Sequence, residues 1–311
     1  MRYFDLHCDT IGLCEKRKAG LYKNKLHISL KKAEIFEQYI QCYAAFIPDS
    51  LQGDEAFFYF CKLKECLDKE LEKNKEIISR CREVGDLKKL SKKFGAIFTV
   101  ENAKAIGGKI ENLHKLGEYG VKAITLTWNA ENELGAGVRA VEEKGLTAFG
   151  REVLTEMNEM KMVPDLSHAS EQLFYETAEF YKKPFLITHS NAKKVCKHPR
   201  NLTDDQFKLV RDRKGLVGLN FYNMFLNDEP KKATITDVFR HAEHFLSLGG
   251  EDTLAMGSDF DGGIDLPKGM KNVSHVKKIQ EFFLKQGYAE TLVDKIFYGN
   301  AMRFFTENNL L

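Results

Sequence analysis

The sequence alternates short apolar segments with amphipathic ones, and this alternation constrains the fold more than any other feature. The apolar segments lack polar alternation, which is typical of strands buried on both faces of a parallel sheet. The segments between them repeat apolar residues at three- and four-residue spacing, as helices with one buried face do. We expect eight strands, at residues 4–9, 40–48, 96–101, 121–128, 162–168, 184–189, 215–221 and 253–259.

Eight strand–helix units in 311 residues predict a (β/α)8 TIM barrel, with a doubly wound open sheet as the alternative. The first strand is not followed by GxGxxG, and GxxxxGKS or GxxxxGKT does not occur, which argues against nucleotide binding. The chain has 6 prolines and no tract of Gly and Ser that would mark a linker. We therefore expect residues 1–311 to form a single catalytic domain.

Several helices can be placed more closely. Residues 54–89 follow a helical pattern, and residues 203–213 form another predicted helix with Thr203 as N-cap and Gln206 at the capping-box position. His241 and His244 form an HxxH pair on a further predicted helix, where we expect a solvated outer face rather than a metal site.

The charge and cysteine content of the chain limit the kinds of molecule that it is expected to bind. The net charge is only +2 and the charged residues are interleaved, so neither a nucleic acid nor a membrane surface is expected to bind. Seven cysteines without a CxxC pair are typical of reduced thiols. Met1 and Arg2 lead directly into the first predicted strand, so we expect no signal peptide. These features predict a soluble cytoplasmic protein.

Ionisable residues lie at the ends of five expected strands. Taken singly, each is explained as a satisfied histidine or a helix N-cap. In a barrel, however, the C-terminal ends of the strands meet at one mouth, and buried charges are costly unless they are paired or bind a metal. The set comprises His7, Asp9, Glu101, His168, His189 and Asp259.

Three histidines with carboxylates form a nitrogen and oxygen ligand set that suits Zn²⁺, with Mn²⁺ or Fe²⁺ as alternatives. The set is larger than one catalytic zinc needs, so we expect two metal ions bridged by Glu101. Asp259 is then free to act as general base and acid. Asp165 is open between a structural role and orienting a ligand. Asp261 is expected either to orient a ligand or to cap the following turn, and the cap is favoured.

The motifs His7-Cys8-Asp9, Glu101, Asp165-Leu166-Ser167-His168, Thr188-His189-Ser190 and Ser258-Asp259-Phe260-Asp261-Gly262 together resemble the membrane (renal) dipeptidase family over nearly the whole chain. The resemblance implies that His7, Asp9 and Glu101 hold one zinc and that Glu101, His168 and His189 hold the other. It also implies that Arg200 binds the free carboxylate of the substrate, a role that suits a planar guanidinium.

The chain departs from this family in ways that bear on the substrate. Trp128 stands where the membrane enzymes have a histidine, so Asn129 or Asn132 is expected to supply an oxyanion donor. Tyr222 is a further candidate for substrate contact. We expect this protein to lack the signal peptide and lipid-anchor tail of the membrane enzymes, and a homodimer is implied by the resemblance alone.

The sequence therefore predicts a two-zinc dipeptidase in which a metal-bridging hydroxide attacks the carbonyl of a dipeptide, including dipeptides with a C-terminal D-residue. Another amidohydrolase-type barrel hydrolase is an alternative, but many of these carry HxH on the first strand and a lysine on the fourth. A catalytically silent metal-binding relative is the other alternative, and it has no need of Asp259 or Arg200.

Overall fold

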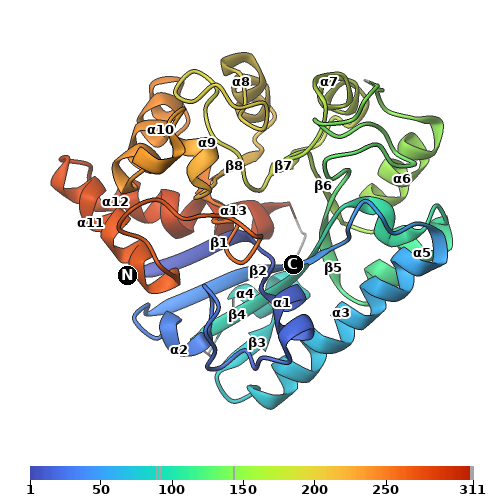
Figure 1. The fold of residues 1–311 in the computed structure, drawn as a ribbon, viewed down its shortest axis with the longest axis horizontal. Helices are drawn as coiled ribbons and strands as arrows, with labels where there is room; N and C mark the ends of the chain where they lie inside the picture. Colours follow the sequence, from blue (N-terminus) through green and yellow to red (C-terminus); the bar gives the residue numbers. More distant parts are fainter. Residues whose placement is uncertain (89, 91–92, 143, 309–311) are drawn as a thin grey trace.

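The chain folds into a closed barrel of parallel strands surrounded by helices, in a computed structural model that describes residues 1–88, 90, 93–142 and 144–308 (Figure 1). Within these residues the barrel strands follow the order β2-β1-β9-β8-β7-β6-β5-β4, and pairing of β2 with β4 closes the ring. Closure confirms the (β/α)8 TIM barrel and excludes the open sheet. The strands are β1 (Arg2–Cys8), β2 (Gln38–Phe46), β4 (Phe94–Glu101), β5 (Val121–Thr125), β6 (Val163–Asp165), β7 (Leu186–Ile187), β8 (Leu216–Leu219) and β9 (Leu254–Met256).

Helices cover the outside of the barrel. For example, α10 buries Val238, Ala242 and Phe245 and packs against β8 and β9. The α-helices are α1 (Thr10–Arg17), α2 (Leu30–Ala33), α3 (Gly53–Lys73), α4 (Val84–Lys88), α5 (Ile110–Glu118), α6 (Ala148–Glu159), α7 (Glu171–Phe180), α8 (Asp204–Asp212), α9 (Asn223–Leu226), α10 (Ile235–Ser247), α11 (Val276–Lys285), α12 (Glu290–Asp294) and α13 (Asn300–Glu307). Shorter helical turns are η1 (Ala103–Ile106), η2 (Pro230–Lys232), η3 (Val273–His275) and η4 (Lys295–Gly299).

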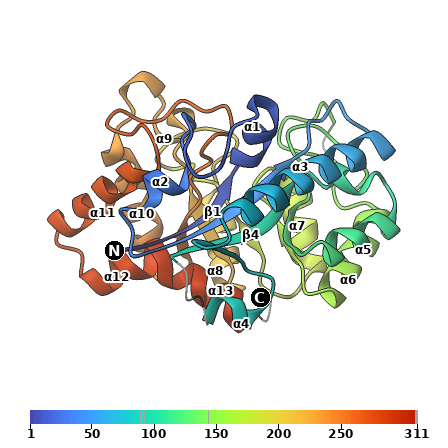
Figure 2. The ribbon, with the colours of Figure 1, turned by 90° about the horizontal axis from the view of Figure 1, so that it is seen from below.

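The two ends of the barrel differ: a helix closes one end, and the candidate functional residues lie at the other. Apolar side chains from the strands fill the interior, and α13 packs on it from below, where Phe305 stacks on Phe4 with ring centroids 5.5 Å apart. Figure 2 shows α4 and α13 at this end and α1 and α9 at the opposite end. Because α1 and α9 follow β1 and β8, the opposite end is the mouth, where the C-terminal ends of the strands lie.

The helix predicted over residues 54–89 is wrong beyond Lys73. There α3 ends, and Asn74 donates from Nδ2 to the Glu70 carbonyl 2.8 Å away. A short strand, β3 (Ile78–Arg80), then pairs with the start of β4, and α4 follows it. The apolar stripe stops at Leu71, since the next positions on that face are polar, and this break was the available signal. Lys89 lies outside the described residues.

Other local predictions have mixed outcomes. The capping box at Thr203 and Gln206 is confirmed, with each side chain accepting from the backbone N–H of the other. The solvated face predicted for His241 is wrong. This ring is fully buried, accepts at Nδ1 from the Ala192 N–H at 3.0 Å and donates from Nε2 to the Leu226 carbonyl at 3.1 Å. Ala192 lies in the loop after β7 and Leu226 lies in the segment after β8, and both cover this ring.

The cysteines are free thiols, as predicted, and Cys8 is fully buried in the barrel wall. In the part of the chain that the structure describes, no helix is both long enough and apolar enough to cross a membrane.

Candidate active site

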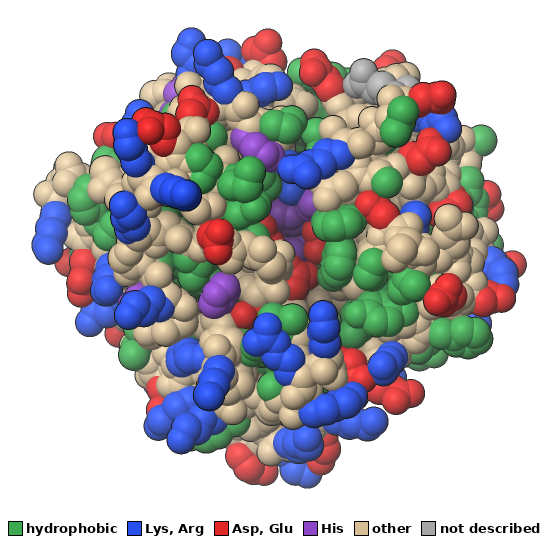
Figure 3. All heavy atoms as spheres, in the orientation of Figure 1, with side chains coloured by type: hydrophobic (Ala, Val, Ile, Leu, Met, Phe, Trp, Pro, Cys, Tyr) green, Lys and Arg blue, Asp and Glu red, His purple; other side chains and the backbone are tan. Residues whose placement is uncertain are grey.

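The barrel mouth brings the six predicted ionisable residues together. All six side chains are buried, although they come from positions as far apart as residue 7 and residue 259. Figure 3 shows histidine and acidic side chains in a hollow at the centre of this face, with basic side chains on its rim. A concentration of buried ionisable groups at the C-terminal end of a barrel is the usual position of an active site.

Glu101, the last residue of β4, lies at the centre of this cluster. Its Oε2 is 3.5 Å from Nε2 of His7, and its Oε1 is 2.9 Å from Nε2 of His168. The Nε2 atoms of His168 and His189 are themselves 3.0 Å apart. One carboxylate therefore faces a histidine on one side and a histidine pair on the other, which is the position of a group that can bridge two cations.

The protonation of these groups reflects their burial. Burial, with the neighbouring Asp9 charge, raises the pKa of Glu101 to about 8. Burial lowers the pKa of His168 and of His189 well below the usual value, so both rings are neutral and offer lone pairs. Burial also lowers the pKa of His7, but the carboxylates of Asp9 and Glu101 outweigh it and raise the pKa well above the usual value.

The other side of the cluster combines His7 with Asp9 and Asp259, whose candidate ligand atoms lie within 4.8 Å of one another. Asp9 lies just beyond β1, at the N-cap position of α1, but its side chain makes no capping hydrogen bond. Among the described residues, the buried atoms Nε2 of His7 and Oδ1 of Asp9 have no hydrogen-bond partner. Buried polar atoms are rarely left unpaired, so these donor atoms fit a metal ion.

A second network fixes the histidine pair from behind. Asp165 accepts hydrogen bonds at Oδ2 from the hydroxyls of Thr125 and Thr188, at 2.6 and 2.7 Å, and at Oδ1 from Ser167. The Thr188 hydroxyl is 2.8 Å from Nδ1 of His189. Since this hydroxyl donates to Asp165, it accepts from Nδ1–H, which leaves the Nε2 lone pair of His189 facing Glu101.

Asp259 is held beside the cluster by its backbone and by one amide. Its φ of 60° lies in the left-handed region, and its Oδ2 accepts from Nδ2 of Asn220 at 2.9 Å. Burial raises the pKa of Asp259 to about 6, which His7 opposes and Asp9 reinforces. A carboxyl that titrates near neutrality suits a group that exchanges protons.

Gly262 lies against both carboxylates of this side. A Cβ at this position would stand 2.5 Å from Oδ1 of Asp259 and 2.6 Å from Oδ2 of Asp9. Only a residue without a side chain fits here. The sequence shows a glycine after Asp261, but nothing in it signals this close approach.

Arg200 lies at the rim of the cluster and is buried rather than on the surface. Its Nε donates to the Ser167 carbonyl at 2.8 Å and its Nη2 to the His189 carbonyl at 3.4 Å. The guanidinium is thus fixed against the two segments that carry the histidine pair. Its remaining N–H groups are left for an anion.

The aromatic residues at the mouth differ in their surroundings. The ring of Trp128 is half-buried, with its centroid 4.8 Å from Phe46 and 6.3 Å from His168. Tyr222 is half-buried at the start of α9, and its hydroxyl contacts the sulfur of Met224 at 2.8 Å. Trp128 therefore borders the histidine pair directly.

The contacts of Asn129 and Asn132, the two asparagines predicted as alternative oxyanion donors, differ. Asn132 donates from Nδ2 to Oδ1 of Asn102 and to the Leu126 carbonyl, at 3.0 and 2.7 Å, so its amide is already used. Asn129 is half-buried in the loop after β5. Of the two, Asn129 therefore stays the candidate donor to the oxyanion.

The turn-capping role expected of Asp261 is wrong. Its carboxylate is buried and accepts from the Thr10 hydroxyl at 2.7 Å and from the backbone N–H groups of His27 and Ile28, at 2.7 and 3.2 Å. Asp261 thereby fastens the loop after β9 to the start of α1. Sequence spacing carries no signal for such long-range partners, and the same holds for the contact between Asn220 and Asp259.

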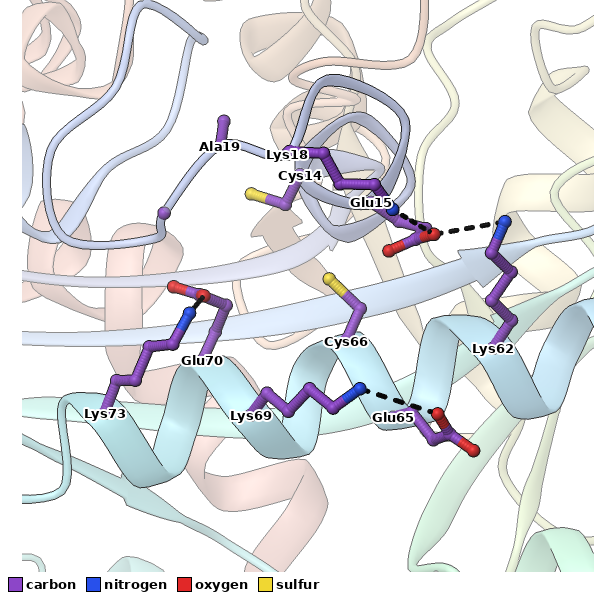
Figure 4. A pocket seen from close by; sticks show the side chains of 11 residues that line it. Cys14, Glu15, Lys18, Ala19, Lys62, Glu65, Cys66, Lys69, Glu70 and Lys73 are labelled. Atoms are coloured by element: carbon purple, nitrogen blue, oxygen red, sulfur yellow. Dashed lines mark hydrogen bonds and ion pairs between the residues drawn. The ribbon is translucent and has the colours of Figure 1, made fainter.

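A cavity of about 390 Å³ lies between α1 and α3, and its lining includes none of the six clustered ionisable residues (Figure 4). The thiols of Cys14 and Cys66 face it from the two helices. The lysines around it pair with glutamates: Lys18 and Lys62 with Glu15, Lys69 with Glu65, and Lys73 with Glu70. It is a groove lined by ion pairs, and the buried, perturbed groups that mark a catalytic centre are at the mouth instead.

Comparison with known proteins extends these observations. A family model described as membrane dipeptidase (peptidase family M19) matches residues 1–311. A Klebsiella pneumoniae protein described as an uncharacterized protein in the pqqA 5′ region is 34% identical over 235 residues, which are 73% of this chain and 84% of that protein.

Two crystal structures share the fold over nearly all of both chains. A metallo peptidase from Rhodobacter sphaeroides, liganded with a phosphinate mimic of the dipeptide L-Ala-D-Ala, is 25% identical with a TM-score of 0.91 and covers 99% of each chain. A metallo peptidase of family M19 called dipeptidase AC is 26% identical with a TM-score of 0.92, covering 100% of this chain and 99% of that one.

Proposed function

Because the chain belongs to the membrane dipeptidase family, peptidase family M19, and is thus a metal-dependent dipeptidase, we propose that it cleaves short dipeptides with two zinc ions. The position of Glu101 between His7 and the His168–His189 pair carries this proposal. The five candidate ligand side chains around this carboxylate are more than one catalytic zinc needs, which supports two ions.

The metal ligands follow from the two sides of the cluster. His7, Asp9 and Glu101 would hold one Zn²⁺, and Glu101, His168 and His189 the other. Two such ions lower the pKa of a bound water and polarise the peptide carbonyl. The nitrogen and oxygen donors favour Zn²⁺, with Mn²⁺ or Fe²⁺ as alternatives, and the unpartnered atoms of His7 and Asp9 support binding on the first side.

Asp259 is the proposed general base and acid. Its carboxylate takes a proton while the carbonyl is attacked and gives it to the leaving amine. Its pKa, raised to about 6 by burial, supports both roles near neutral pH. Asn220 keeps the carboxylate oriented through the hydrogen bond to Oδ2.

Arg200 is the proposed site for the C-terminal carboxylate of the substrate, and this restricts the enzyme to short peptides. Its two hydrogen bonds to backbone carbonyls pre-set the guanidinium, so little side-chain entropy is lost when the carboxylate binds. Asn129 and Tyr222 are proposed to contact the substrate at the same mouth. The L-Ala-D-Ala mimic bound by the Rhodobacter sphaeroides relative supports acceptance of a C-terminal D-residue.

Metal analysis with a panel of L,L and L,D dipeptides tests the proposal. We expect two metal ions per chain, hydrolysis of dipeptides but not of longer peptides, and loss of activity in Asp259→Asn with its metal retained. Asp212→Asn is the matched control, because Asp212 is an exposed carboxylate paired with Arg211. Less than one metal per chain, or full activity in Asp259→Asn, would contradict the proposal.

We propose further that residues 1–311 form one catalytic domain, since the last helix, α13, plugs the barrel that β1 begins. The homodimer implied by the family resemblance remains a prediction, which light scattering coupled to size-exclusion chromatography measures directly.

A further inference from the structure

A second arginine reaches the same side of the mouth as Arg200. Arg139 lies in the loop after β5, and its backbone N–H donates to the Asn129 carbonyl at 2.9 Å. The preceding Val138 N–H donates to the carbonyl of His168 at 2.8 Å. These two consecutive hydrogen bonds fix the backbone of the loop at Arg139. The neighbouring residue, Val138, contacts His168 of the histidine pair.

This loop packs beside the segment that carries Arg200. Val138, Pro199 and Arg200 line one small cavity, and Gly137, Val138 and Pro199 line the adjacent cavity of about 330 Å³. The two arginines thus come from segments that pack against each other, and the charge of Arg139 acts on the Arg200 guanidinium.

The charge of Arg139 is uncompensated among the described residues. Its side chain is exposed and has no ion-pair or hydrogen-bond partner there, in contrast to Arg151, which faces Glu176 at 4.0 Å. Burial lowers the pKa of His198 to about 4, and the charges of Arg200 and Arg139 act in the same direction. Two guanidinium groups and a neutral histidine therefore share one region of the mouth, which favours a ligand with two negative charges.

We propose that Arg139 binds the side-chain carboxylate of a C-terminal Asp or Glu and so selects dipeptides with an acidic second residue. This inference rests on the proposed function, in which Arg200 holds the α-carboxylate. A C-terminal acidic residue carries its second carboxylate a few bonds from the first, so both reach the same side of the mouth. An acidic N-terminal residue would lie across the metal cluster, away from Arg139.

The test compares the zinc-loaded wild type with Arg139→Gln on matched dipeptides, Ala-Glu against Ala-Gln and Ala-Asp against Ala-Asn, in L,L and L,D forms. The measured quantity is the ratio of kcat/KM for each acidic dipeptide to that for its amide. We expect the wild-type ratio to favour the acid and to fall about tenfold in Arg139→Gln, the usual scale for a charge-assisted hydrogen bond at a partly exposed site. Arg139→Glu should turn the preference toward Ala-Lys, and Arg151→Gln on α6 should leave the ratio unchanged.

Several results would overturn the inference. A wild-type ratio near one, an equal loss for acid and amide in Arg139→Gln, or a preference for Glu-Ala over Gln-Ala would each do so. The first of these leaves the proposed function intact, since both dipeptides are still cleaved. A zinc-loaded protein that cleaves none of the dipeptides refutes the proposed function and this inference with it.

Discussion

The substitution Gly262→Ala tests most directly how tightly the carboxylates at the mouth are packed. The added Cβ would lie 2.5 Å from Oδ1 of Asp259 and 2.6 Å from Oδ2 of Asp9, whereas ordinary contact begins at 3.4 Å. The two oxygens must therefore retreat by 0.9 and 0.8 Å, the differences between these distances. Both side chains are buried, so neither can swing into solvent to relieve the overlap.

A displacement of this size acts on function more than on folding. Moving reacting groups by about 1 Å costs roughly a hundredfold in rate, and overpacking a buried site costs about 1–3 kcal/mol of stability. We expect Gly262→Ala to lower kcat/KM for a dipeptide about a hundredfold and to weaken metal binding on the Asp9 side. The fold should persist, as measured by circular dichroism and thermal denaturation.

Gly12→Ala is the matched control. Gly12 lies in α1, three residues after Asp9, and a Cβ there meets nothing within 4 Å. Replacing a helical glycine should leave activity unchanged and stabilise the protein by about 0.5–1 kcal/mol. If Gly262→Ala keeps more than a third of the wild-type kcat/KM with full metal content, the carboxylates are not held as the structure shows, and the proposed roles of Asp9 and Asp259 fail.

The remaining predictions concern the supporting groups and the pH. Asp165→Asn should weaken metal binding about 10–100-fold, measured by competition with a chelator, because the hydroxyl relay to His189 loses its acceptor. Arg200→Lys should lower kcat/KM about a hundredfold with metal content unchanged, since an ammonium cannot form a bidentate pair with a carboxylate. An unchanged KM would argue against binding of the substrate carboxylate by Arg200. The metal-free protein should lose thermal stability as the pH rises from 6.5 to 8.5. Burial raises the pKa of Glu101 to about 8, and the neighbouring carboxylates raise the pKa of His7. Over this range the folded state therefore loses protons that it binds more tightly than the unfolded state does, and its stability falls. Saturating zinc should remove or reverse this trend, since it binds the deprotonated groups; a metal-free melting temperature independent of pH would contradict the cause assigned to these shifts.

The sequence predicted the barrel and the members of its site because both depend on local patterns. Apolar runs mark strands, and an ionisable residue at the end of such a run is conspicuous. The strand β3 was missed because three residues among lysines and glutamates show no period. Its pairing with β4 is a contact between segments that only the closed barrel brings together.

The parts of the site that escaped prediction are contacts between distant segments. Asn220 reaches Asp259 across 39 positions of sequence, and Asp261 reaches Thr10 across 251. His241 was assigned to a solvated face because helical periodicity shows which residues share a face but not whether a loop covers it. The importance of Gly262 is visible only as a distance to two carboxylates.

The closure of the barrel has a consequence for synthesis of the chain on the ribosome. One side of the cluster joins residues from the first and the last strand of the barrel. The Asp259 N–H donates to the His7 carbonyl, and β1 pairs with β9. His168 and His189 come from the middle of the chain and can meet earlier. A nascent chain therefore cannot assemble the complete site until β9 has left the exit tunnel and docked on β1, so a chain still being synthesised has no peptidase activity before that point.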